Sequence, residues 1–219
     1  MLEKEAIEKG IDIESLKSEQ EKLAKLVSLK DAFDFGNATR FAGVDLETLK
    51  TKEILATIAV LDENMELVEE KYAIKPARFP YIPGFRAYRE LPCILAAYEK
   101  LEEQPDVFFI EANGIAHPRG LGLASHLGIS INKPVIGITN HVLVGEEKGE
   151  DVVLKGKIIA KKIITKQGSK PFYVSPGHLI SIASAVELVK KCVREPHKLP
   201  EPLVMARKIA TKIRREIER

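Results

Sequence analysis

Apolar residues near the start of the chain recur at the spacing of an amphipathic helix. Charged residues separate these positions, which are Ile13, Leu16, Leu23, Leu26 and Val27. We therefore expect the first thirty or so residues, within a segment bounded by 1–35, to form a helix that packs on the rest of the chain and contributes stability.

Three short runs that are apolar, or that alternate apolar with polar residues, follow this helix. They cover residues 41–46, 54–61 and 67–74, and the turn-forming Asp62-Glu63-Asn64 separates the last two. This pattern predicts a meander of antiparallel strands.

Beyond Pro83-Gly84 the pattern changes to helices that alternate with continuous apolar runs. A helical pattern over 91–101 precedes the apolar run 107–110, and a second helix near 121–127 precedes the run 135–138. A strand buried on both faces has this composition, and helices between such strands imply parallel pairing. The sequence therefore predicts an α/β fold in which an antiparallel meander is followed by parallel βα units.

The last third of the chain predicts a hairpin and two helices. The hairpin strands fall within 152–154, 157–164 and 172–174, with Lys155-Gly156 as a turn. Helices are expected over 182–193 and 202–217. The apolar stripe of the second helix comprises Met205, Ile209, Ile213 and Ile217.

The composition indicates the class of protein but says little about its function. The 219 residues, 45% of them hydrophobic, suit one domain spanning 1–219, and a net charge of +2 does not by itself indicate a nucleic-acid partner. The distant cysteines, Cys93 and Cys192, are interpreted as reduced thiols. No apolar run reaches the ~18 residues that a membrane span needs, so a cytoplasmic location without membrane attachment is expected.

Three carboxylates stand at positions where chemistry is plausible, each with an alternative. Asp45 interrupts an apolar strand, either as a strand-end cap of a turn or as a ligand of a divalent metal. Glu111 follows the buried run 107–110, as a solvated residue or at the carboxyl end of a parallel strand, where α/β sheets place their sites. Glu90 lies in the first turns of a helix, where a surface acid also complements the helix dipole.

If these acids converge, their oxygens suit Mg²⁺, which also keeps waters and phosphate oxygens as ligands. Phosphodiester hydrolysis is the expected chemistry, because such ions activate the attacking water and stabilise the leaving oxygen. The glycine-rich segment 114–122, with His117 and Arg119, either forms turns or brings backbone N–H groups close to a phosphate or a base.

Four motifs, in order along most of the chain, closely resemble the endonuclease V family, which nicks DNA, and in some members RNA, beside deaminated adenine (inosine). They are Phe41-Ala-Gly-Val-Asp45-Leu, the segment Pro80-Tyr81-Ile-Pro83-Gly84 that continues to Glu90, the segment from Gly114 to Gly128, and Val174-Ser-Pro-Gly-His178. The resemblance implies an RNase H-like fold, a Mg²⁺ cofactor for which Mn²⁺ substitutes, a nucleic-acid partner and a monomer.

Carried over by position, the resemblance implies roles for individual residues. Asp45, Glu90 and Glu111 match the catalytic acids, with Asp45 and Glu111 as metal ligands. Tyr81 matches an aromatic wedge that helps the altered base leave the stack, unless it is an apolar plug of the core. Gly84, with the backbone around Ala112 and Gly114, would form the base pocket, with His117 and Arg119 in its lining loop. Pro83 is a further expected nucleic-acid contact. For His178 we expect a structural role, tying a strand end to the following helix.

The sequence departs from the family at three positions. Glu111-Ala112 stands where the family has Asp-Gly, Asn140 where it has a lysine that contacts phosphate, and Arg207 where it has a histidine near the metals. Asn140 is expected to contact nucleic acid through hydrogen bonds, without the charge of a lysine. Arg207 is expected to contact a phosphate, since arginine binds phosphate but neither ligates a metal nor acts as a base. For Arg207 the alternative is a solvated surface charge. The departures leave two further hypotheses open: a relative that binds nucleic acid without cleaving it, and a nuclease with a changed substrate.

Overall fold

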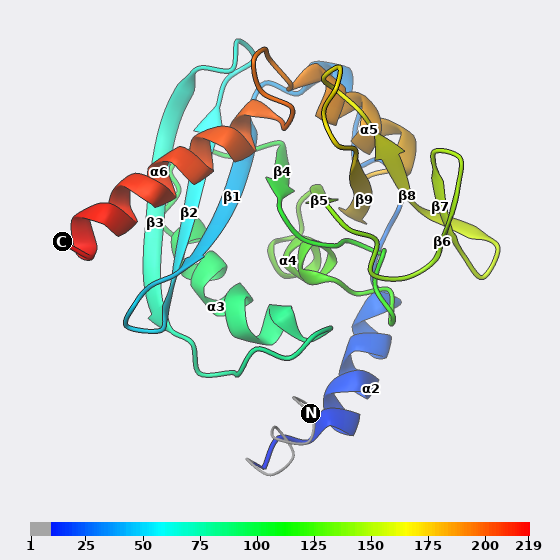
Figure 1. Cartoon of the computed structure of the whole chain (residues 1–219), viewed down its shortest axis with the longest axis horizontal. Helices are drawn as coiled ribbons and strands as arrows, with labels where there is room; N and C mark the ends of the chain where they lie inside the picture. Colours follow the sequence, from blue (N-terminus) through cyan, green and yellow to red (C-terminus); the bar gives the residue numbers. More distant parts are fainter. Residues whose placement is uncertain (1–9) are drawn as a thin grey trace.

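The computed structural model describes residues 10–219 and shows one large twisted sheet with helices on both faces (Figure 1). The sheet has nine strands in the order β3-β2-β1-β4-β5-β9-β8-β7-β6. The longer helices are α2 (Ile13–Ala24), α3 (Arg86–Tyr98), α4 (Leu123–Ile131), α5 (Ile182–Lys191) and α6 (Glu201–Ile217). None of the helices within residues 10–219 combines the length and hydropathy of a membrane span.

The antiparallel meander predicted from the sequence is confirmed. It consists of β1 (Phe41–Thr48), β2 (Glu53–Leu61) and β3 (Leu67–Pro76), each antiparallel to the next. Asp62 shapes the turn between the last two strands, because its Oδ1 accepts hydrogen bonds from the backbone N–H groups of Asn64 and Glu66, both at 2.9 Å.

The parallel part of the sheet is also confirmed. Strand β4 (Val107–Ile110) pairs in parallel with β1 on one side and with β5 (Val135–Thr139) on the other. Helices α3 and α4 cover one face of these strands, and α5 and α6 cover the opposite face. Burial on both faces accounts for the continuous apolar composition of β4 and β5. The architecture is the RNase H-like mixed sheet that the sequence indicates.

The later strands complete the sheet on its other side. They are β6 (Glu146–Lys148), β7 (Asp151–Leu154), β8 (Lys157–Ile163) and β9 (Phe172–His178), and β9 is antiparallel to β5. Lys155 and Gly156 form the predicted turn between β7 and β8, with φ of 50° and 76°. Strand β6 was not predicted, because its three exposed residues are charged and carry no apolar pattern.

The N-terminal helix is shorter than predicted, and residues 1–9 lie outside the described residues. Helix α2 ends at Ala24, so the expectation that Leu26 and Val27 belong to it is wrong. Tertiary hydrogen bonds hold the following segment: Leu179 N–H donates to Ser28 O at 2.7 Å, and Ser28 N–H donates to His178 Nδ1 at 3.2 Å. His178 thus ties the end of β9 to this segment rather than to the following helix.

The buried face of α6 also differs from the predicted stripe. Ile209 and Ile213 point inward as expected, but Ile217 is 45% exposed and Met205 only half-buried. Leu203, Ala206 and Ala210 complete the inner face. Small side chains on this face allow α6 to lie close to β1, and Gly43 allows the closest approach: a Cβ at Gly43 would lie 1.9 Å from Pro202 O.

Gly43→Ala is therefore expected to destabilise the fold. The added methyl meets backbone atoms of α6 that cannot rotate away, so the free energy of unfolding should fall by about 3 kcal/mol. Urea unfolding measures this change. Gly36→Ala is the matched control, because its Cβ meets only the Asp34 side chain, at 3.1 Å; an equal loss in both variants contradicts the close-approach argument.

Candidate active site

Sheet geometry places Asp45 and Glu111 side by side. Val44 pairs with Ile110 in the parallel register of β1 and β4, so the next residue on each strand is an acid. Side chains alternate across a strand, and both acids share the face of Phe41 and Phe109, which α6 covers. Because β1 continues to Thr48, the interpretation of Asp45 as a strand-end cap is wrong.

The two acids line a small pocket between the strands and α6. Its volume is about 300 Å³, and its charged lining residues are Asp45, Glu47, Arg86, Glu111 and Arg207. We call this the acid pocket. Asp45 is 9% exposed, whereas the Glu111 side chain is about one third exposed.

Arg207 lies between the two acids. Its Nε is 3.8 Å from Asp45 Oδ1, and its Nη2 donates a hydrogen bond to Glu111 Oε2. Asn140 Nδ2 donates to the other carboxylate oxygen of Glu111, at 3.2 Å. Asn140 and Arg207 therefore both contact Glu111, and Arg207 is not merely a solvated surface charge.

Glu90 reaches this region from the opposite face of the sheet. It is 8% exposed on α3, so its interpretation as a surface acid is wrong. Arg86 Nε donates to Glu90 Oε2 at 2.5 Å, and Arg86 Nη1 donates to the backbone oxygen of Glu111 at 2.8 Å. Arg86, which sequence reasoning did not single out, thus joins Glu90 to the acid pocket. Its place one helical turn before Glu90 is the signal that was available.

Burial sets the electrostatics of the site. It raises the pKa of Asp45 to about 6, an effect that the nearby Arg207 opposes and that Glu47 and Glu111 reinforce. Burial also raises the pKa of Glu90, again opposed by an arginine, Arg86. Among the described residues, no hydrogen-bond donor contacts the carboxylate of Asp45, and Arg207 is the cation paired with it, while Arg86 lines the same pocket.

The carboxylates suit a hard divalent cation, although within residues 10–219 no cluster of three or more His, Cys, Asp and Glu side chains could hold a metal ion. Mg²⁺ is commonly bound through one or two carboxylates together with water and substrate phosphate. Asp45 and Glu111 supply such a pair, and the buried Asp45 carboxylate lacks a hydrogen-bonded partner. The residues present therefore fit the ion, provided that the Arg207 guanidinium leaves Glu111.

A larger cavity adjoins the acid pocket and shares Arg86 and Glu111 with it. Its volume is about 470 Å³. Residues that the sequence assigned to nucleic-acid contact gather here: Tyr81, Pro83, Gly84, Ala112, His117 and Asn140. Tyr81 is 58% exposed, so the alternative that it plugs the core is wrong. We call this the base cavity.

Three side chains fix one wall of the base cavity through a single carbonyl. Gly84, with φ of +80°, turns its backbone oxygen towards Gln20 Nε2 at 3.0 Å, His117 Nε2 at 3.0 Å and Arg119 Nη2 at 2.9 Å. Gln20, 1% exposed, comes from α2 and was missed; its polarity among the apolar positions of an amphipathic helix was the available signal. Helix α2 therefore supports the site as well as the fold.

Gly114 and Arg119 lie behind the cavity wall. A Cβ at Gly114 would be 2.1 Å from Pro176 O, so this glycine packs the loop against β9. The Arg119 guanidinium lies over the Phe85 ring, 4.5 Å from its centroid, and its Nε donates to Gln20 Oε1. The structure thus places both residues where they position the loop.

The buried imidazole of His117 predicts that the fold loses stability in acid. Burial, reinforced by Arg119, lowers the pKa of His117 from 6.5 to about 4. Between these values the unfolded chain binds more protons, so the free energy of unfolding falls as the pH falls, by up to about 3 kcal/mol. In urea unfolding at neutral and at mildly acidic pH, His117→Gln should lose less stability than the unsubstituted protein; equal losses would show that His117 is not responsible.

Comparisons with known proteins agree with the resemblance of the motifs. The sequence model of the endonuclease V family matches residues 21–208. The endonuclease V of Rippkaea orientalis is 42% identical over 209 residues, which cover 91% of this chain and 90% of that protein. The endonuclease V of Trichormus variabilis is 39% identical over 202 residues, covering 88% and 90%.

Solved structures give the same result. The crystal structure of the Bacillus subtilis endonuclease V superimposes with a TM-score of 0.87 at 26% identity, covering 95% of this chain and 94% of that one. The Ciona intestinalis endonuclease V, in complex with a 24mer DNA containing an inosine followed by a ribo-adenosine, superimposes with a TM-score of 0.85 at 26% identity, covering 94% and 98%. The chain therefore belongs to the endonuclease V family of nucleases.

Proposed function

We propose that this chain is a metal-dependent endonuclease that hydrolyses a phosphodiester bond 3′ to a deaminated base, inosine, in DNA or RNA, as part of nucleic-acid repair. The observation that carries the proposal is the acid pair, Asp45 beside Glu111, at the edge of a cavity lined by Tyr81 and Gly84. The bound DNA of the Ciona intestinalis relative, which contains inosine, supports the class of substrate. We further propose that residues 1–219 act as a single-domain monomer.

In this proposal Asp45 and Glu111 hold Mg²⁺, for which Mn²⁺ substitutes. When bound, the ion supplies a more acidic water as nucleophile and stabilises charge on the leaving oxygen. Glu90 acts in the same catalytic set and fixes Arg86, which in turn holds the backbone of Glu111. Arg207 leaves Glu111 and contacts the phosphate, since guanidinium groups bind carboxylate and phosphate in the same geometry.

The base cavity would receive the altered base. Peptide groups at Gly84 and Ala112, beside Pro83, would read its edge, because Gly114 packs the loop against β9 and so limits its freedom to adapt to a different base. The exposed ring of Tyr81 would fill the space that the base leaves in the stack. Asn140 would contact the phosphate without the charge of a lysine, and His117 and Arg119 would hold the loop.

One observation favours a second candidate, a nucleic-acid-binding relative in which cleavage is weak. Arg207 contacts both acids, and its positive charge stands where a catalytic cation would be needed. A guanidinium compensates the acids but neither activates water nor exchanges ligands. The two candidates differ in whether the bound strand is cut.

Asp45→Asn tests the proposed cleavage. With labelled inosine-containing single- and double-stranded DNA and RNA in Mg²⁺ or Mn²⁺, the unsubstituted protein should cut beside inosine. The variant keeps the shape of the side chain but loses the charge, so its rate should fall by about 100-fold or more. Tight binding without cutting by the unsubstituted protein supports the second candidate, and cutting that ignores inosine indicates a changed substrate.

Restoring the family residues tests the effect of Arg207 and Glu111. Arg207→His removes the guanidinium that pairs with the acids, and Glu111→Asp shortens the acid; each should raise the Mg²⁺-dependent rate, by about tenfold or more together. Arg40→Gln is the control, because Arg40 pairs instead with Glu103, at 2.8 Å, and neither residue lines the acid pocket. An unchanged or lower rate in the double variant contradicts the proposal that these departures limit catalysis.

A further inference from the structure

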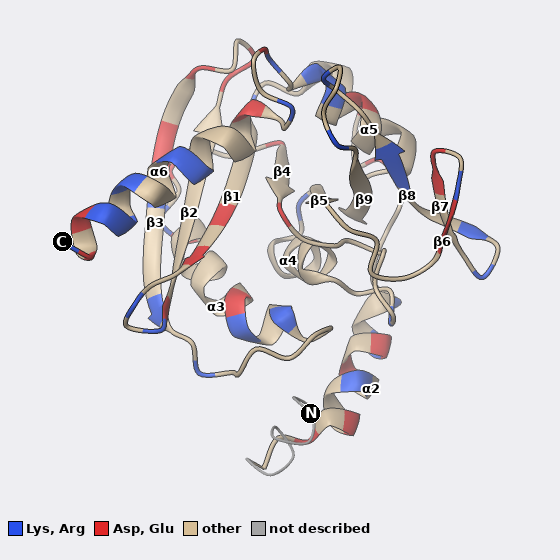
Figure 2. Ribbon diagram, viewed as in Figure 1, with Lys and Arg blue, Asp and Glu red and all other residues tan. Residues whose placement is uncertain are grey.

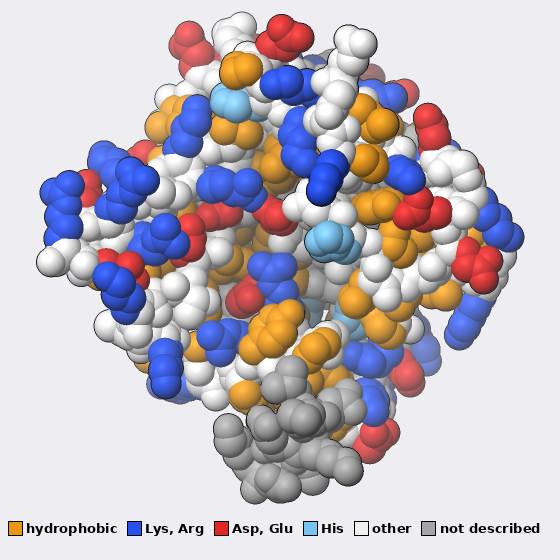
Figure 3. Space-filling view, in the orientation of Figure 1, with side chains coloured by type: hydrophobic (Ala, Val, Ile, Leu, Met, Phe, Trp, Pro, Cys, Tyr) orange, Lys and Arg blue, Asp and Glu red, His pale blue; other side chains and the backbone are white. Residues whose placement is uncertain are grey.

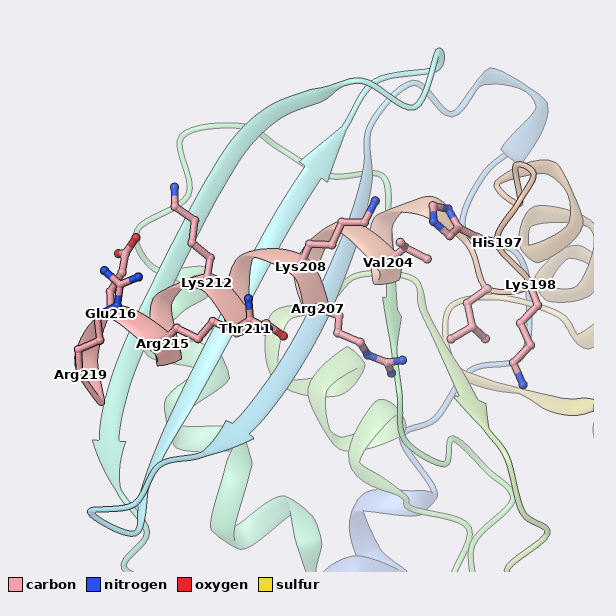
Figure 4. A pocket seen from close by; sticks show the side chains of 11 residues that line it. His197, Lys198, Val204, Arg207, Lys208, Thr211, Lys212, Arg215, Glu216 and Arg219 are labelled. Carbon is pink, nitrogen blue, oxygen red and sulfur yellow. The ribbon is translucent and has the colours of Figure 1, made fainter.

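A groove along α6 adjoins the acid pocket. Its volume is about 760 Å³, and Leu199 and Val204 give it an apolar floor. Six of its lining side chains are cationic and one is acidic: Lys198, Arg207, Lys208, Lys212, Arg215 and Arg219, with Glu216. Figures 2 and 3 show Lys and Arg gathered over α6, and Figure 4 shows the labelled cations following one another along the helix.

The cations are available to a ligand. Lys208, Lys212 and Arg215 are exposed, and within residues 10–219 none of them forms an ion pair. Their neighbour Arg214, by contrast, is engaged with Glu47. The overall charge of the chain is only +2, so this concentration of positive charge is local to α6. An anionic partner with several charges in a row is the chemistry that the groove fits.

The spacing of the cations suits a polynucleotide backbone. Lys208, Lys212 and Arg215 follow at intervals of four and three residues, which keeps them on one side of a helix. The rise from Lys208 to Arg215 is ~10 Å, about three nucleotide steps of a stacked strand.

The groove is also continuous with the proposed catalytic site. Arg207 lines both the groove and the acid pocket, while Arg86 and Glu111 line both the acid pocket and the base cavity. The three hollows therefore follow one another in the order base cavity, acid pocket, α6 groove. A strand with its altered base in the first and its scissile phosphate in the second continues into the third.

We infer that the α6 groove binds the backbone of the nucleic-acid strand on the 3′ side of the cleaved bond. The assignment of the groove to the 3′ side rests on the proposed function, in which the cleaved bond lies 3′ to the recognised base. Lys208, Lys212 and Arg215 contact successive phosphates there and carry no base specificity. The groove therefore adds affinity that depends on the length of the 3′ flank and on salt, and not on inosine.

The test compares the triple variant Lys208→Gln/Lys212→Gln/Arg215→Gln with the unsubstituted chain. Fluorescence anisotropy measures binding of single-stranded DNA, without added divalent metal, for oligonucleotides with a short or a long flank on either side of inosine. The long 3′ flank should strengthen binding by the unsubstituted chain by about tenfold, and the triple variant should lose this gain. The slope of log affinity against log salt should fall by about 2, from three lost phosphate contacts.

A matched control carries the same charge change elsewhere. Lys148→Gln/Lys155→Gln/Lys157→Gln removes three exposed lysines of the β6–β8 region, at the other end of the sheet, and should keep the 3′ gain and the salt slope. An equal 3′ gain in the triple variant and the unsubstituted chain overturns the inference, as does a gain from the 5′ flank alone. Binding to phosphatidylserine vesicles in preference to DNA overturns it as well.

The proposed function is assessed separately in the same assay. Preference for inosine over adenosine at equal length reports the base cavity, whereas the flank and salt dependence of unmodified DNA reports the groove. If the unsubstituted chain shows no preference for inosine, but its salt slope still differs from that of the triple variant, the proposed base recognition fails. The groove then remains a site that binds the nucleic-acid backbone.

Discussion

The close approach of α6 to β1 at Gly43 is the packing contact on which the site depends. It brings the N-terminal turns of α6 over the strand two residues before Asp45, so that Arg207 reaches the carboxylates of both β1 and β4. The parallel register of those strands supplies the other half of the arrangement, because it sets Asp45 and Glu111 next to each other. A side chain at position 43 would separate the helix from the sheet, and with it the cation from the acids.

The balance between the carboxylates and the arginines of the acid pocket then decides the chemistry of this site. A buried carboxylate is stable only with a cation or hydrogen-bond donors beside it, and Asp45 pairs with Arg207, with Arg86 in the same pocket. In a metal-dependent nuclease the cation needed at such acids is an exchangeable ion, whereas here a covalently attached guanidinium shares the position. Asn140 reinforces this balance, since it holds the second oxygen of Glu111 without adding charge. The charge of the acid pocket is therefore set by Arg207 and by the acids that it pairs with.

Hydrogen bonds between segments distant in the chain hold the wall of the base cavity. One carbonyl, that of Gly84, accepts hydrogen bonds from Gln20 of α2 and from His117 and Arg119 of the loop after β4, so two distant parts of the chain hold the Gly84 wall of the base cavity. Shared lining residues connect that cavity to the acid pocket and the acid pocket to the α6 groove. The three hollows are thus separate but adjoining, as the proposed placement of base, phosphate and flanking strand requires.

The sequence by itself determined the elements, their pairing and the family, because the period of the apolar residues and the long local motifs record them directly. It also singled out Asp45 and Glu111 as candidates, since an acid inside or beside a buried strand is visible as a break in an apolar pattern, and Glu90 by its place in a helix and in a family motif. Only the tertiary structure decided that α2 ends at Ala24, that Gln20 and Arg86 join the site, and that Arg207 lies between the acids. Those facts depend on helix packing and on hydrogen bonds between residues far apart in the chain, which local periodicity does not encode.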